Sequence, residues 1–327
     1  MPSPRSSSVP NFSNPAALPS GFHAFRIAAN DVGFWTYVWK GDPGPTLLIN
    51  GATHGDEYEG PTLLRTWAAH WRPRRLKGTL IAVPVLNEGA FAAGRRVDPR
   101  DNADLARAFP GGSKDAPTAR LAHLFDQTVL AYATHYVDLH SAGNAYELLP
   151  WVGFMACAEP IQSIQRQMAE SFEGFWCWAG PHLSGRTLSA AYERGVAAIY
   201  VECKGAGSIC KMDLRKLELG LKHLMQRLGM LPGKSAAIRK QPFRNATDPA
   251  EAHLQVHHPA PVSGLFIPSP QCSLGRRVRS GQSLGQILPI GPGDPVPVKS
   301  ERAGRLVFLR RQRSVQKGDA LCVVTPV

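Results

Sequence analysis

Four side chains suited to metal binding or acid–base chemistry lie at or just after the ends of short apolar segments. They are His54, Glu57, His140 and Glu202. Two imidazoles and one carboxylate can hold a zinc ion and leave a fourth position for water, whose pKa then falls to about 7. A second carboxylate nearby can carry the proton. These residue types predict a hydrolytic zinc centre.

The spacing of the first two residues supports this prediction. His54 and Glu57 are three positions apart, and an i, i+3 spacing places both side chains on one side of a helical turn. A lone histidine is more often a surface or core residue than a ligand. Here a carboxylate partner and a position after a probable strand occur together, so we interpret His54, Glu57 and His140 as the metal ligands.

Buried strands must position these side chains. The apolar, β-branched runs 46–50, 136–139 and 198–201 each end at one of the motifs. Candidate helices lie between such runs, at 60–70, 116–132, 163–172, 188–194 and 214–228. Strands that alternate with helices indicate an α/β fold, here a mixed sheet flanked by helices. Ligands of such sheets bind beyond the carboxyl ends of the strands, where all three motifs fall.

The 327 residues exceed one typical domain. We expect a disordered tail at 1–20 and a catalytic domain at 21–234. After residue 234, short apolar pieces alternate with Gly and Pro turns, which predicts a linker and a small, β-barrel-like all-β domain at 235–327. The long segment 86–112 is predicted to be a functional loop, because structureless stretches of that length are usually functional.

Composition limits the cellular context. The net charge is +12, but the basic residues are dispersed and lack interleaved aromatic residues, so we expect no nucleic-acid partner. No apolar run approaches the length of a membrane span, so we expect no membrane partner. The six cysteines are scattered without a C-x-x-C pair, which favours reduced thiols and a cytoplasmic protein.

Three segments together resemble a known family. Residues 51–61, 138–143 and 201–207 are similar to the motifs of the succinylglutamate desuccinylase/aspartoacylase family, an amide-hydrolase branch of the zinc-carboxypeptidase-like fold. The order of the motifs and the terminal β-domain match as well, from about residue 21 to the C-terminus. The resemblance implies one Zn²⁺ per subunit, held by His54, Glu57 and His140, with Glu202 as the general base. Asp138 or Asp56 is a candidate to orient a ligand.

The long loop also resembles a family segment that clamps the substrate. The family usually has Asp-Leu-Asn-Arg, whereas this chain has Asp104-Leu105-Ala106-Arg107. Arg107 can still hold a carboxylate through two hydrogen bonds, but Ala106 offers no side-chain amide. Arg96 is a second candidate, placed to stabilise a tetrahedral oxyanion.

These observations predict a zinc-dependent hydrolase that cleaves the amide bond of a small N-acylated amino acid or amine. The expected partner is a small-molecule substrate, with a homo-oligomer left open. Two alternatives remain. The first is a zinc carboxypeptidase-type exopeptidase, which uses the same centre in an open groove. The second is a non-catalytic binding protein with a retained metal site, for which the altered position Ala106 is the argument.

Overall fold

The computed structural model describes residues 17–233, 243–245 and 258–326 of the chain. The predicted disordered tail therefore lies almost wholly outside the described residues, as does most of the predicted linker. In the part of the chain that is described, no helix is long and apolar enough to span a membrane.

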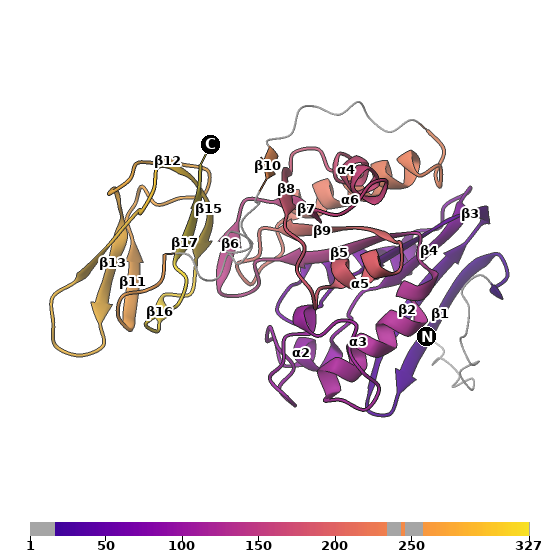
Figure 1. Cartoon of the computed structure of the whole chain (residues 1–327), viewed down its shortest axis with the longest axis horizontal. Coiled ribbons are helices and arrows are strands. Elements are labelled where there is room, and N and C mark those ends of the chain that lie inside the picture. The colour runs from indigo at the N-terminus through magenta and orange to yellow at the C-terminus, as the bar shows by residue number, and fades with distance from the viewer. Residues whose placement is uncertain (1–16, 234–242, 246–257, 327) are drawn as a thin grey trace.

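A nine-stranded sheet forms the centre of the larger domain (Figure 1), in the order β1-β2-β4-β3-β5-β9-β7-β8-β10. Its strands are β1 (Gly21–Ala29), β2 (Val32–Lys40), β3 (Asp42–Asn50), β4 (Lys77–Val83), β5 (His135–Ser141), β7 (Trp151–Met155), β8 (Trp176–Gly180), β9 (Ala197–Cys203) and β10 (Phe243–Asn245). The strands β4, β3, β5 and β9 run parallel, whereas β7 runs antiparallel to β9. The sheet is therefore mixed, as predicted.

The central strands are buried on both faces, and this explains their nearly continuous apolar sequences. In β3, residues 47–50 are all buried, and in β5 residues 136–141 are. The register pairs Asn50 with Asp138 and His140 with Glu202. The carboxyl ends of β3, β5 and β9 therefore meet at one edge of the sheet, where the predicted site residues lie.

Helices cover the two faces of the sheet (Figure 1). On one face pack α1 (Glu59–His70), α4 (Ile161–Ala169) and α6 (Lys211–Arg227). On the other pack α3 (Pro117–Thr128) and α5 (Thr187–Glu193). Leu217, Leu221 and Leu224 of α6 recur at helical spacing and are buried, so an amphipathic stripe attaches this helix to the sheet.

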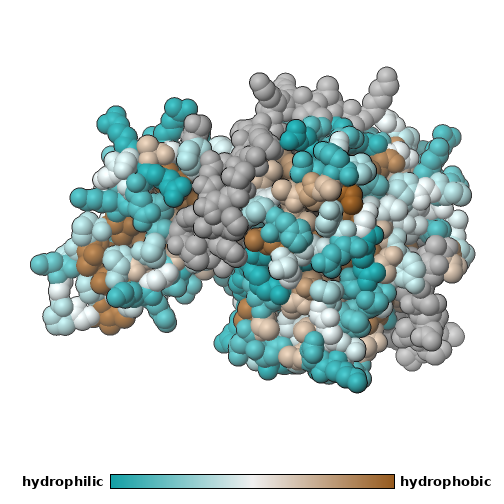
Figure 2. Space-filling model, viewed as in Figure 1, coloured by the Kyte–Doolittle hydropathy of each residue, from teal (hydrophilic) through white to brown (hydrophobic). Residues whose placement is uncertain are grey.

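The C-terminal domain consists of two small sheets, ordered β14-β13-β11-β16 and β12-β15-β17. The strands are β11 (Gly264–Pro268), β12 (Arg277–Val278), β13 (Ser283–Pro289), β14 (Val296–Lys299), β15 (Gly304–Arg310), β16 (Ser314–Val315) and β17 (Cys322–Thr325). A short strand of the larger domain, β6 (Tyr146–Leu148), pairs with β15 and joins the two domains. Figure 2 shows hydrophilic side chains spread over both domains, with hydrophobic ones gathered near β11 and β13.

The structure confirms the predicted fold class, a mixed α/β sheet with a small all-β domain. It differs from the sequence prediction in two places. The predicted loop 86–112 contains helix α2 (Glu88–Ala92) and the 3-10 helix η2 (Leu105–Arg107). The strands β6, β7 and β8, all between β5 and β9 in the chain, were not predicted. The domain boundary at 234 stays a prediction, and β10 beyond it pairs with β8 of the large sheet.

Candidate active site

The loop that follows β3 is held against the next part of the chain. The backbone of Ala52 accepts a hydrogen bond from the Asn87 N–H, and Ala52 itself has a φ of 49°. This left-handed conformation is unfavourable for alanine, and such strain is stored mainly at functional sites. A Cβ on Gly55 would lie 2.0 Å from the Ala90 carbonyl carbon, so only glycine fits there. These contacts fix the path of the segment that carries His54 and Glu57.

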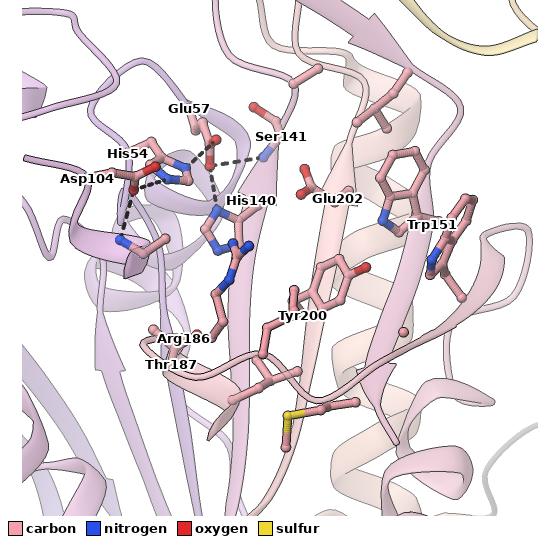
Figure 3. Close-up of a pocket in the computed structure, with 18 of the residues that line it drawn as sticks. His54, Glu57, Asp104, His140, Ser141, Trp151, Arg186, Thr187, Tyr200 and Glu202 are labelled. Atoms are coloured by element: carbon pink, nitrogen blue, oxygen red, sulfur yellow. Dashed lines mark hydrogen bonds and ion pairs between the residues drawn. The ribbon is translucent and has the colours of Figure 1, made fainter. Parts of the chain in front are cut away.

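His54, Glu57 and His140 converge at the carboxyl edge of the sheet (Figure 3). The Nδ1 atom of His54 lies 2.7 Å from Oε1 of Glu57, and the Nδ1 atom of His140 lies 2.9 Å from Oε2. One potential ligand atom from each residue lies within 4.8 Å of the others. The side chains are 4%, 2% and 9% exposed, so water competes little for these groups.

The opposite nitrogen of each imidazole faces another carboxylate. Nε2 of His54 lies 3.0 Å from Oδ1 of Asp104, and Nε2 of His140 lies 3.0 Å from Oδ2 of Asp138. A carboxylate in this position fixes the orientation and tautomer of a metal-binding imidazole and raises its basicity. Asp56, the other candidate orienter, instead accepts a hydrogen bond from the Asn144 N–H.

Asp138 is fully buried and lies in a polar network. Its carboxylate accepts hydrogen bonds from the Asn50 amide, the Thr53 hydroxyl and the Thr187 hydroxyl, at 3.0, 3.0 and 2.7 Å. The Tyr136 hydroxyl in turn donates to Oδ1 of the Asn50 side chain at 2.6 Å. A buried carboxylate is costly unless it is hydrogen-bonded, so this network can stabilise the charge that faces His140.

The charges at this centre oppose the effect of burial. Burial raises the pKa of Glu57, but the imidazoles of His54 and His140 outweigh it and hold the pKa below its ordinary value. Burial lowers the pKa of His140, but Asp138 and Glu57 raise it well above its usual range. Burial also raises the pKa of Asp104, and His54 and Arg96 reverse this. The surrounding carboxylates thus favour a positive charge on the His140 imidazole.

This donor set fits a divalent metal ion. Both Nδ1 atoms and the Glu57 carboxylate face a common point, while both Nε2 atoms face carboxylates. Histidine nitrogen with carboxylate oxygen is a common ligand set of catalytic zinc. The carboxylates that favour a positively charged His140 would also favour a metal cation bound between these side chains.

Glu202 lies beside this centre at the end of β9, opposite His140 in the strand register (Figure 3). Burial is the main reason that the pKa of Glu202 is raised to about 8; Glu57 acts in the same direction, while His140 and Arg96 act against it. A carboxyl group with a pKa near the operating pH is suited to proton transfer. The adjacent Cys203 points to the opposite face and is buried in the core, where burial raises the pKa of its thiol.

Three arginines line the same cavity. Arg96 donates to Oδ2 of Asp104 at 3.1 Å and lies 3.9 Å from Glu57. Arg107 donates to the Ala106 carbonyl oxygen, and Arg186 extends towards His140 in Figure 3. Neither Arg107 nor Arg186 forms an ion pair with a carboxylate of the described residues. Both cations are therefore available to an anionic ligand.

The cavity has a volume of about 390 Å³, which suits a small molecule. The centre lies at one side of it. The other side is aromatic and aliphatic, and it includes Trp151, Trp178, Tyr200 and Phe308. Phe308 belongs to β15, so the C-terminal domain contributes part of the wall.

The structure brings together every residue predicted for the site: His54, Glu57, His140, Glu202, Arg96 and Arg107 all line one cavity. The sequence analysis did not identify Asp104 as the partner of His54, although it stands in the segment 104–107 that resembled the family. It also missed Arg186 and the aromatic residues. The pair Trp151 and Trp178 could have been noticed, because each belongs to a short apolar run after a turn.

Comparison with protein families gives an independent result. The model of the succinylglutamate desuccinylase/aspartoacylase catalytic domain matches residues 43–228. This range contains the three motifs and all the predicted site residues.

Known proteins are similar to the chain over nearly its whole length. It is 28% identical to an N-α-acetyl-L-2,4-diaminobutyric acid deacetylase from Halomonas elongata, over 94% of this chain and 91% of that protein. A crystal structure of a succinylglutamate desuccinylase from Silicibacter sp. TM1040 superposes with a TM-score of 0.83 at 26% identity, over 95% and 97% of the two chains. The product-bound ectoine utilization protein EutE from Ruegeria pomeroyi gives 0.83 at 27% identity, over 95% and 98%.

Proposed function

Because the chain belongs to the succinylglutamate desuccinylase/aspartoacylase family, we propose that it is a zinc-dependent deacylase. It cleaves the amide bond of a small N-acylated amino acid or amine. The observation that carries this proposal is the convergence of His54, Glu57 and His140 beside Glu202, a partly buried carboxylate with a raised pKa. The named substrate of the Halomonas relative, an N-acetylated amino acid, is of the same chemical class.

His54, Glu57 and His140 would hold the zinc ion, and Asp104 and Asp138 would orient the two imidazoles. When bound, zinc supplies Lewis-acid polarisation and makes water more acidic. One zinc ion per subunit satisfies this ligand set. The hydrogen bonds to Asp138 from Asn50, Thr53 and Thr187 hold its carboxylate in place beside His140.

Glu202 takes the proton from the attacking water and later gives it to the departing amine. Its raised pKa makes it a stronger base than an ordinary carboxylate, and its partly buried position limits the access of bulk water to it. Arg96, which is fixed by Asp104, supplies positive charge where the carbonyl oxygen becomes negative.

Arg107 and Arg186 hold the carboxylate of the substrate. Both line the cavity and lack an ion-pair partner among the described residues. Guanidinium groups suit this role because their planar geometry matches a carboxylate. In the family an asparagine and an arginine hold this carboxylate. Here Ala106 stands in place of the asparagine, and Arg186 supplies a second contact beside Arg107.

We place the enzyme in the cytoplasm. All six cysteines are described, and all are free thiols, as expected of a protein in a reducing compartment. Its partner is the small-molecule substrate.

The Glu202→Gln variant tests the proposal. It should keep its zinc content but lose about 10²- to 10⁴-fold in kcat, the usual range for general acid–base catalysis. Glu193→Gln is a matched control, since Glu193 is an exposed glutamate that does not line the cavity. Near wild-type activity of Glu202→Gln would contradict the assigned role.

A further inference from the structure

One side of the active-site cavity is a continuous aromatic surface. Trp151, Trp178 and Tyr200, hereafter the aromatic wall, come from the adjacent strands β7, β8 and β9. The ring centroids of Trp151 and Trp178 lie 5.6 Å apart at a tilt of 35°. Figure 3 shows Trp151 and Tyr200 on the side of the cavity opposite His54 and Asp104, with Glu202 between them.

The strand register builds the wall. Trp151 pairs with Glu202, and Gly153 pairs with both Tyr200 and Trp178. All five side-chain positions therefore share one face of the sheet. Gly153 has no side chain, and a Cβ there would lie 2.1 Å from the Tyr200 ring. The missing side chain lets the Tyr200 ring lie across β7, which joins the three rings into one surface.

The wall contains no charged group. Among the described residues that line the cavity, the carboxylates are Glu57 and Asp104 at the centre and Glu202 between the centre and the wall. Glu57 contacts both imidazoles, and Asp104 contacts His54 and Arg96. Beyond them the lining near the wall continues with apolar side chains, among them Phe154, Met155, Leu148 and Leu188.

From this arrangement we infer that the substrate carries a bulky apolar group, preferably an aromatic ring, which packs on the aromatic wall while Arg107 and Arg186 hold its carboxylate. The inference rests on the proposed deacylase function and specifies its substrate class. The apolar group belongs either to the side chain of the amino acid or to the acyl group, because the wall lies beside Glu202 and both halves of the amide meet there.

The same surface disfavours charged substituents. An ammonium group packed on these rings would lose its hydration; the one carboxylate beside the wall is Glu202, which the proposed reaction uses for proton transfer. A second carboxylate would be desolvated against indole rings. Burial of an unpaired charge is costly, whereas an apolar or aromatic group gains from the same contact.

Competing amides test the inference. We would measure kcat/KM of the zinc-loaded enzyme for N-acetyl-L-phenylalanine, N-benzoylglycine, N-acetyl-L-aspartate and N-α-acetyl-L-2,4-diaminobutyrate. One of the two aromatic amides should exceed both charged amides by about tenfold or more, since a methylene-sized change in a hydrophobic pocket already gives about 10- to 200-fold. Preference for N-acetyl-L-phenylalanine assigns the wall to the amino-acid side chain, and preference for N-benzoylglycine assigns it to the acyl group. Equal or faster cleavage of a charged amide would overturn the inference while leaving a deacylase.

A matched pair of variants locates the effect. Trp178→Leu should lower the selectivity for the preferred aromatic amide over N-acetylglycine by about tenfold. Trp176→Leu is the control, because Trp176 shares the strand and the face but does not line the cavity. Its selectivity should match the wild type. The ratio does not depend on the folded fraction, so it remains interpretable if Trp178→Leu is less stable. An unchanged ratio in Trp178→Leu would refute the assignment.

Binding separates this inference from the proposed function. Calorimetry with zinc-loaded Glu202→Gln should show N-acetyl-L-phenylalanine or N-benzoylglycine binding about tenfold more tightly than N-acetyl-L-aspartate. If no amide is cleaved by the wild type, the deacylase proposal fails, and this binding difference alone decides the inference. Equal binding of all the ligands would overturn it.

Discussion

Glu202 should destabilise the metal-free protein as the pH rises, and Glu202→Gln should remove this cost. Burial raises the pKa of Glu202 from an ordinary 4.5 to about 8. Between these values the folded protein keeps a proton that the unfolded chain has released. Stability therefore falls with increasing pH across this interval: the contribution of the neutral carboxyl is fully present below pH 4.5 and is lost as the pH passes 8.

The size of the effect follows from the interval. From 4.5 to about 8 it spans about 3.5 pH units, and each is worth about 1.4 kcal/mol. The stability difference between Glu202→Gln and the wild type should grow by about 3 kcal/mol between pH 4.5 and pH 7, and by about 4 kcal/mol between pH 4.5 and pH 9. The total free energy of unfolding of a domain is only about 5–15 kcal/mol, so the loss caused by Glu202 is large for one residue. Residues that destabilise the fold to this extent are typically retained because activity requires them.

Urea unfolding of both proteins with a chelator present, at pH 5, 7 and 9, measures this difference. Titrating groups that do not interact with Glu202 are shared by the two proteins and cancel in the comparison. Glu193→Gln, at an exposed glutamate outside the cavity, is the control for the loss of a carboxylate elsewhere. A pH-independent difference for Glu202→Gln would refute the argument that burial controls this carboxyl group.

Three further predictions concern the ligands and their partners. His140→Ala should lose bound zinc, measured by elemental analysis after dialysis, because it removes a ligand and leaves Glu57 with one imidazole; full zinc occupancy would exclude His140 from the ligand set. Asp138→Asn should weaken zinc affinity about 10- to 100-fold in a chelator competition, since it removes the charge 3.0 Å from Nε2 of His140; unchanged affinity would mean that Asp138 has only a structural role. Arg107→Ala should raise KM for carboxylate-bearing amides by about tenfold and spare neutral amides, as expected for the loss of a charge-assisted contact of about 1.5–3 kcal/mol; an equal loss on both would contradict the clamp.

The sequence was sufficient to select four residues that the structure brings together, although their roles stay predictions. His54, Glu57, His140 and Glu202 follow strands that are buried on both faces, and such strands are continuous apolar runs that are easily recognised. In a largely parallel sheet the carboxyl ends meet at one edge, so convergence of the motifs followed from the order of the elements.

Other parts of the site depend on contacts that no local pattern encodes. Asp104 reaches His54 across 50 positions, and its neighbours show only a turn and a 3-10 helix. The strands β7 and β8 are five residues long, and such short apolar runs do not distinguish a strand from a helix segment. The aromatic wall depends on the register of these strands, and on Gly153, whose missing side chain matters only after Tyr200 has been placed above it.

The central claim is that this chain is a metal-dependent deacylase. The most direct test is amine release from N-acyl amino acids by protein stripped with a chelator and then restored with zinc, with C-terminal dipeptides included in the panel. We predict that the stripped protein is inactive, that one equivalent of zinc restores cleavage of an N-acylated amino acid, and that dipeptides are not cleaved. Full activity without metal, or cleavage of dipeptides alone, would contradict the account.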